Sequence, residues 1–98
     1  MRRRFVLVTD VLTSEQERQL VAALGSVAWW HHIPNMWLIV DEANQVNTEM
    51  LRGLLTAIAP LAKMFASEAT EGWWAVRYDT TIPAQAAWFQ QFWSSPDA

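Results

Sequence analysis

The sequence predicts one α+β domain, with two helices packed on one face of a four-stranded antiparallel sheet. Its 98 residues suit a single domain spanning 1–98, and a composition of 52% hydrophobic and 17% charged residues argues for a folded core. Strand-type and helix-type apolar patterns follow one another in the order strand, helix, strand, strand, helix, strand. The chain has no Cys, which excludes a disulfide scaffold and a thiolate metal site, and it has seven Trp against one Tyr.

The first two elements are a strand and a helix. Residues 5–10 have the sequence FVLVTD, an apolar and β-branched run that ends in two polar residues, so we expect a short, fully buried strand. A helix over 15–24 follows. Ser14 and Glu17 have the spacing of a capping box at its start, and Gly25 is a natural stop.

Two further strands are expected over 27–33 and 36–41, joined as a hairpin. Pro34 presets the backbone at the first central position of a tight turn, and Asn35 tolerates the second. The run 36–41 is the most apolar of the chain, so we place it at the centre of the sheet.

A second helix and a fourth strand complete the pattern. Asn47 or Thr48 caps the helix, and Pro60 disfavours helical geometry at the residue before it and so ends the helix. Four apolar side chains at i, i+3, i+4 and i+7 give the helix one buried face: Leu51, Leu54, Leu55 and Ile58. Residues 61–69 form the fourth strand.

Residues 70–98 are predicted to be a Trp-rich extension of the core. The segment 72–78 fits either a fifth strand or an aromatic extension without regular structure. Pro83 then opens a final helix over 84–93, with aromatic side chains on two adjoining faces.

The order βαββαβ over residues 5–69 fits two split βαβ units, which is the ferredoxin-like arrangement. Both helices then cover one face of the sheet, and the other apolar face needs a partner, the C-terminal extension or a ligand to cover it. Neighbouring side chains in a strand point to opposite faces. The pairs Trp29-Trp30 and Trp73-Trp74 should therefore each direct one ring toward the helices and one toward the open face.

Charge is distributed unevenly along the chain. Three of the seven basic residues are Arg2, Arg3 and Arg4, and the rest of the chain carries four basic and ten acidic residues. This acidic body should repel phosphate backbones, so long nucleic acid is not an expected partner. We expect the arginine run to be a solvated, frayed end. No apolar run is as long as a secretion signal or a membrane span, which favours a cytoplasmic protein without membrane contact.

The ending Val8-Thr9-Asp10 of the first strand, the helix after it and the hairpin over 29–41 resemble small ferredoxin-like proteins related to the CRISPR-adaptation endonuclease. The resemblance extends over residues 5–78. In that family an acidic residue ends the first strand and, across a homodimer, helps to hold a metal ion for phosphodiester cleavage. The resemblance therefore implies a metal-ligating role for Asp10 in a metal-dependent nuclease.

The residue types alone favour structural roles for the three candidate ligands. The carboxylate of Asp10 suits Mg²⁺, but an Asp at a strand end also accepts hydrogen bonds in the following loop, and no second acidic residue is spaced to join it. His31 and His32 carry imidazoles, which bind transition metals. Because adjacent strand residues face opposite ways, we expect hydrogen-bonded strand histidines, with no bound metal and no cofactor.

Motifs of the common enzyme classes are missing, with no nucleophile elbow and only three Gly for a phosphate-binding loop. Five aromatics could form a core and an interface or could stack a nucleobase: Trp29, Trp30, Trp37, Trp73 and Trp74. The leading hypothesis is a small non-catalytic binding protein, a homodimer that engages a protein partner through its Trp-rich sheet face and tail, in the style of phage-encoded inhibitors of host proteins. The alternatives are a nucleotide-binding module, with the two His as hydrogen-bond donors, and the metal-dependent nuclease.

Overall fold

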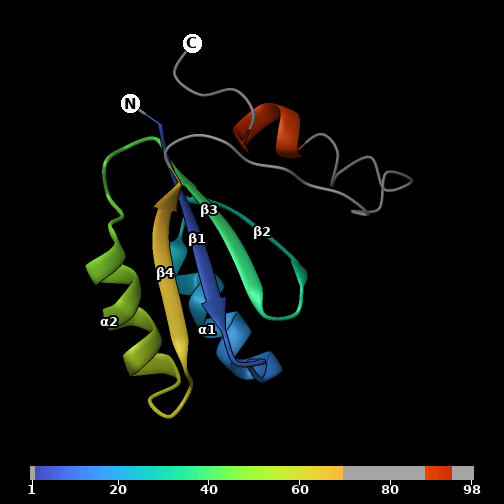
Figure 1. Cartoon of the computed structure of the whole chain (residues 1–98), viewed down its shortest axis with the longest axis vertical. Coiled ribbons are helices and arrows are strands. Elements are labelled where there is room, and N and C mark those ends of the chain that lie inside the picture. The colour runs from blue at the N-terminus through green and yellow to red at the C-terminus, as the bar shows by residue number, and fades with distance from the viewer. Residues whose placement is uncertain (1, 70–87, 94–98) are drawn as a thin grey trace.

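The structure, a computed structural model, describes residues 2–69 and 88–93 and packs a four-stranded antiparallel sheet against two helices (Figure 1). The elements in chain order are β1 (Arg3–Thr9), α1 (Ser14–Leu24), β2 (Ala28–Ile33), β3 (Met36–Asp41), α2 (Thr48–Ile58), β4 (Met64–Ala69) and η1 (Phe89–Trp93). The strand order across the sheet is β2-β3-β1-β4, and both helices pack on one face. The predicted ferredoxin-like order βαββαβ is confirmed.

The strand pairing fixes which side chains share a face of the sheet. Val8 of β1 lies opposite Met36 of β3 and opposite Phe65 of β4, whereas Leu7 lies opposite Trp37. Cross-strand partners point to the same side of a sheet, and successive residues alternate. The sheet therefore has a helix side, which contains Leu7, and an open side, which contains Val8.

The main core lies between the sheet and the two helices. Its buried members are Phe5, Leu7, Leu12, Leu20, Leu24, Trp37, Ile39, Val46, Leu51, Leu55 and Ala59. The buried leucines of each helix are four residues apart, Leu20 with Leu24 and Leu51 with Leu55, so each pair lies on one face of its helix. This apolar face attaches each helix to the sheet.

The start of α1 differs by one residue from the prediction. Thr13 is the N-cap: its Oγ1 accepts from the Gln16 N–H at 3.1 Å, and the Gln16 side chain accepts from the Thr13 N–H at 2.9 Å. The predicted box of Ser14 and Glu17 is wrong. The carboxylate of Glu17 instead contacts His31 of β2, so a tertiary contact decides between two adjacent boxes of the same pattern.

The second helix, α2, begins and ends where the sequence places it. Asn47 is the N-cap, and its Oδ1 accepts from the Met50 N–H at 2.8 Å. The helix ends at Ile58, because Pro60 disfavours helical geometry at Ala59. None of the helices in the described part of the chain is long and apolar enough to cross a membrane.

Three strands differ from the prediction in length or burial. β1 begins at Arg3 rather than at residue 5 and ends at Thr9, and Val8 is 39% exposed, so this strand is not fully buried. The reason is that Val8 points to the open side. β2 begins one residue later than predicted. β4 begins at Met64 rather than at residue 61, because Leu61 lies in the turn after α2 and is 96% exposed.

The described C-terminal residues lie on the open side of the sheet. Of the helix predicted over 84–93, the structure describes residues 88–93, whose last five residues form the π-helical turn η1 rather than a regular α-helix. This turn packs on the sheet close to the N-terminal end of β1 (Figure 1). The segment 70–87, with Trp73 and Trp74, lies outside the described residues, so the prediction of a fifth strand is not addressed.

Candidate functional site

The open side of the sheet carries three rows of side chains that run across all four strands. The terminal row contains Ala28, Val40, Arg4 and Ala69; the middle row contains Trp30, Leu38, Val6 and Ser67; the far row contains Ile33, Met36, Val8 and Phe65. The turn η1 lies over the terminal and middle rows. The far row lies at the opposite end of the sheet from the start of β1 and the turn η1 (Figure 1).

The terminal and middle rows form an aromatic cluster with η1. Its buried members are Trp30, Leu38, Val40 and Trp93, and we name it the open-face cluster. Trp88 and Phe92 pack against it, with the Trp88 ring centroid 6.2 Å from that of Trp93 and 5.7 Å from that of Phe92. Trp30 is 4% exposed and Trp93 is 3% exposed. A ligand could therefore stack on Trp30 only after this turn has moved away.

The N-terminal arginines hold the turn in place. Arg2 donates from Nη1 to the carbonyl oxygens of Gln91 at 3.2 Å and Phe92 at 3.0 Å. Arg4 donates to the carbonyl of Trp93 at 3.3 Å, and its guanidinium lies 5.6 Å from the centroid of that ring. Carbonyls at the C-terminal end of a helical turn lack partners within the turn and attract cations. The expectation of a solvated, frayed arginine run is therefore wrong.

The third arginine forms a bidentate ion pair across the helix side. Arg3 donates from Nε and Nη2 to the Glu68 carboxylate, at 2.9 and 2.8 Å. The hydrogen bond from Arg3 lowers the pKa of Glu68, and the same bond raises the pKa of Arg3. The pair joins β1 to β4 at the end of the sheet where β1 begins and β4 ends.

A second aromatic group lies on the helix side, at the β2 edge. The His31 ring stacks on Trp37 with centroids 3.8 Å apart and an interplanar angle of 4°. Its Nδ1 lies 2.8 Å from the Met36 carbonyl oxygen, and its Nε2 lies 2.8 Å from the Glu17 carboxylate. Trp29 packs on Trp37 at 5.5 Å and keeps 36% of its surface exposed, whereas Trp37 is 1% exposed.

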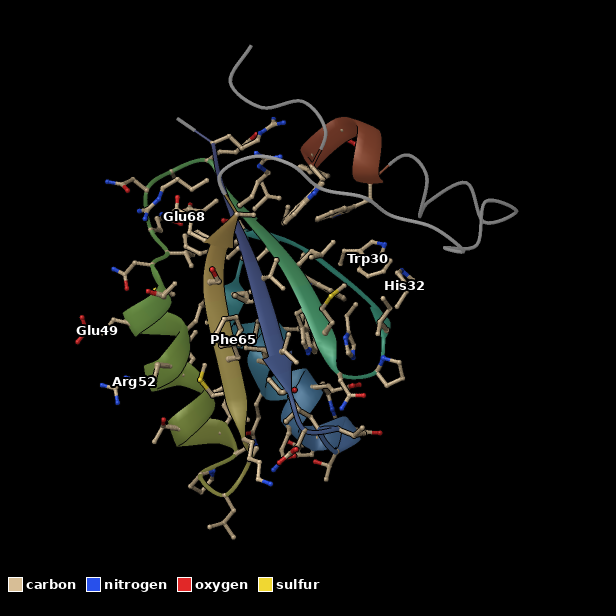
Figure 2. The ribbon with its side chains drawn as sticks, in the orientation of Figure 1. Trp30, His32, Glu49, Arg52, Phe65 and Glu68 are labelled. Carbon is tan, nitrogen blue, oxygen red and sulfur yellow. The ribbon has the colours of Figure 1, made fainter. Side chains whose placement is uncertain are left out.

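The two adjacent pairs divide between the faces as strand alternation predicts. Trp29 joins the helix-side group, and Trp30 belongs to the open-face cluster. His31 contacts Trp37, whereas the His32 ring meets Trp30 edge-on at 5.1 Å. Figure 2 shows Trp30 and His32 together beside β2. The two imidazoles therefore belong to different environments and do not converge on one ion.

Asp10 joins the end of β1 to the start of β4. Its Oδ2 accepts from the Lys63 N–H at 2.8 Å, and its own N–H donates to the Lys63 carbonyl at 3.0 Å. These contacts are those of a loop-stabilising Asp. Within residues 2–69 and 88–93, no three His, Asp or Glu side chains come together as a metal site.

Sequence reasoning missed Asp41, which is a buried carboxylate at the end of β3. It is 1% exposed and accepts backbone hydrogen bonds from Ala43, Gln45 and Val46, at 3.0, 2.6 and 2.7 Å. An Asp between an apolar strand and a short polar loop is the local signal of such a turn. Its role is to order the loop that leads into α2.

Sequence reasoning also missed the exposed apolar end of the open side. Six large apolar side chains are exposed among the described residues, and five lie at the far end of the sheet: Val8, Val11, Ile33, Leu61 and Phe65. Phe65 is 64% exposed and projects from β4, away from the open-face cluster (Figure 2). The signal available in the sequence was the alternation in β4, which places Phe65 and Ser67 on one side and the core-packed Met64 and Ala66 on the other.

Comparison with known proteins identified no relative. No protein-family model matches the chain, and neither the curated proteins nor the solved structures gave a match. The fold class is therefore established by the strand order and the helix placement alone. The resemblance to the CRISPR-adaptation endonuclease group stays a prediction.

Proposed function

We propose that this chain is a small binding protein that engages a protein surface through the open side of its sheet. The observation that carries the proposal is the far row, where apolar side chains from all four strands lie side by side and Phe65 is 64% exposed. A contiguous apolar surface of this kind on a small domain is typical of an interaction site.

The chemistry of the far row supports a protein partner. Its four members are Ile33, Met36, Val8 and Phe65, none of which carries a charge, and charged side chains begin only beyond the row, at Asp10 and Lys63. An uncharged centre with an aromatic residue and a charged rim is the usual composition of a protein interface. Phosphate-bearing ligands would instead need cations within the surface.

A photo-crosslinking experiment tests the proposal. The variant Phe65→p-benzoylphenylalanine keeps an aromatic ring in the row, and the control variant Glu49→p-benzoylphenylalanine places the same group on the exposed surface of α2 (Figure 2). Irradiation of the full chain in its native cells should give protein adducts at position 65 and few at position 49. Equal yields at both positions, or no adduct at position 65, would refute the proposal.

A further inference from the structure

Two residues of opposite charge, Asp10 and Lys63, lie beside the far row. One step beyond Val8 and Phe65, Asp10 and Lys63 are joined by two hydrogen bonds, from the Asp10 N–H at 3.0 Å and to the Asp10 carboxylate at 2.8 Å. Both residues are exposed. The surface therefore runs from an apolar row to a rim with one carboxylate on the β1 side and one ammonium on the β4 side.

We propose, resting on the function proposed above, that the surface bound by the far row is a second copy of this chain. The two sheets face each other around a twofold axis that runs parallel to the strands, between β1 and β4. A rotation about this axis keeps the rows aligned and exchanges the two strands. Val8 then lies over the partner's Phe65, and Asp10 lies over the partner's Lys63.

This arrangement is self-complementary in shape and in charge. A symmetric dimer uses one patch twice, so each contact must be favourable when it is repeated with the roles reversed. The large Phe65 ring meets the smaller Val8 side chain twice, and the carboxylate of Asp10 meets the ammonium of Lys63 twice. Two copies of a chain with net charge −3 repel each other on average. The repulsion is smallest where the facing surfaces are uncharged and the rim carries equal numbers of positive and negative groups.

The turn η1 leaves Val8 and Phe65 of the far row exposed. It packs on Trp30, Leu38 and Val40, with Val6 of β1 and Ala69 of β4 beside them, and Arg4 lies under Trp93. The two copies therefore meet at the far row and not along the whole length of β1 and β4. In such a dimer the two sheets lie closest at the far row, and both turns lie at the wider, terminal end.

Sedimentation equilibrium of the purified full chain tests the proposal. Wild-type protein should form a dimer, and Phe65→Glu should raise the dimer dissociation constant by about 30-fold or more, the loss typical of a central interface aromatic. The matched control Ala22→Glu adds the same charge to the exposed surface of α1 and should leave the dissociation constant unchanged. Circular dichroism of each variant establishes that it is folded.

A charge-exchange experiment tests the rim contact separately. Lys63→Glu alone places two carboxylates together at each rim, and Asp10→Lys alone places two ammonium groups together, so each variant should dimerise about 10-fold more weakly than wild type. An equimolar mixture of the two variants restores opposite charges at both rims of the mixed dimer. The mixture should therefore dimerise more tightly than either variant alone, which a purely structural role of either residue would not produce.

The outcomes separate this inference from the function on which it rests. A wild-type chain that stays monomeric, or a dimer that Phe65→Glu and the charge variants leave unchanged, overturns the second-copy proposal. If adducts at position 65 are then formed with a different protein, the binding function stands without the dimer. If position 65 gives no adduct above the Glu49 control, both proposals fail.

Discussion

Replacement of Trp93 by alanine should remove a large part of the stability of the fold. Trp93 is 3% exposed and belongs to the open-face cluster with Trp30, Leu38 and Val40. Its ring also lies over the guanidinium of Arg4. The substitution Trp93→Ala would therefore expose apolar surface on the sheet and remove the cation–π contact.

The expected magnitude follows from the buried area. A buried Trp side chain removes roughly 150–250 Å² from water, which at about 25 cal/mol per Å² corresponds to ~4–6 kcal/mol. This is an upper bound, because the unfolded chain already buries part of that surface. We therefore expect a loss of about 3–4 kcal/mol in the free energy of unfolding, as for other buried Trp→Ala changes.

Urea unfolding followed by far-ultraviolet circular dichroism measures this loss. Fluorescence is less suitable because the chain has seven Trp. All variants are compared at one protein concentration, since self-association would shift the apparent stability. The denaturant slope should also decrease, because a sheet without the docked turn exposes less new surface when it unfolds.

Gln91→Ala is the matched control in the same turn. Its side chain is exposed, and Arg2 donates to its backbone carbonyl, which the substitution keeps. The control should therefore stay within about 0.5 kcal/mol of wild type. If Trp93→Ala costs less than about 1 kcal/mol, or no more than Gln91→Ala, the docked turn does not stabilise the sheet.

Three further substitutions probe the polar contacts, each followed by urea unfolding. The Nε2 atom of His31 lies 2.8 Å from the Glu17 carboxylate. Glu17→Ala removes this contact and should cost about 1 kcal/mol, and an unchanged urea midpoint would contradict that expectation. Asp41→Ala leaves three loop N–H groups without their acceptor and should lower the free energy of unfolding by about 3 kcal/mol. An unchanged free energy of unfolding would show that water replaces the carboxylate. The hydrogen bond from Arg3 lowers the pKa of Glu68. The stabilisation by this pair is therefore present above the ordinary carboxyl pKa and is lost as the pH falls through the lowered pKa of the folded state. Glu68→Gln should remove this part of the pH dependence of stability, and identical stability profiles of variant and wild type would contradict a stabilising role of the pair.

Local patterns in the sequence predicted the elements, because each depends on neighbours within a few residues. The helix face of Leu51 and Leu55 and the stop before Pro60 are examples. The same locality explains the incorrect N-cap of α1. Thr13 with Gln16 and Ser14 with Glu17 both have capping-box spacing, so only the distant contact of Glu17 with His31 distinguishes them.

The candidate site was harder to predict, because it depends on contacts between the two ends of the chain. Alternation predicted that Trp29 and Trp30 face opposite sides. The alternation of side chains along a strand does not predict that Trp93 covers Trp30 and leaves Val8 exposed. That outcome depends on where the C-terminal turn docks, 89 residues from the arginine that holds it. The exposed row follows from the strand register, which a hydrophobicity pattern does not determine.

The arginine contacts also bear on which partners this surface suits. By composition, Arg2, Arg3 and Arg4 are the one cluster of positive charge in an acidic chain. In the fold, Arg2 pairs with Glu42, Arg3 pairs with Glu68, and Arg4 is 9% exposed beneath Trp93. Cations that are already neutralised by carboxylates release few counterions from a nucleic acid. The basic cluster therefore contributes to holding the turn η1 and the strand β4 in place, and this use of its charge inside the fold agrees with the proposal of a protein rather than a polyanion as the partner.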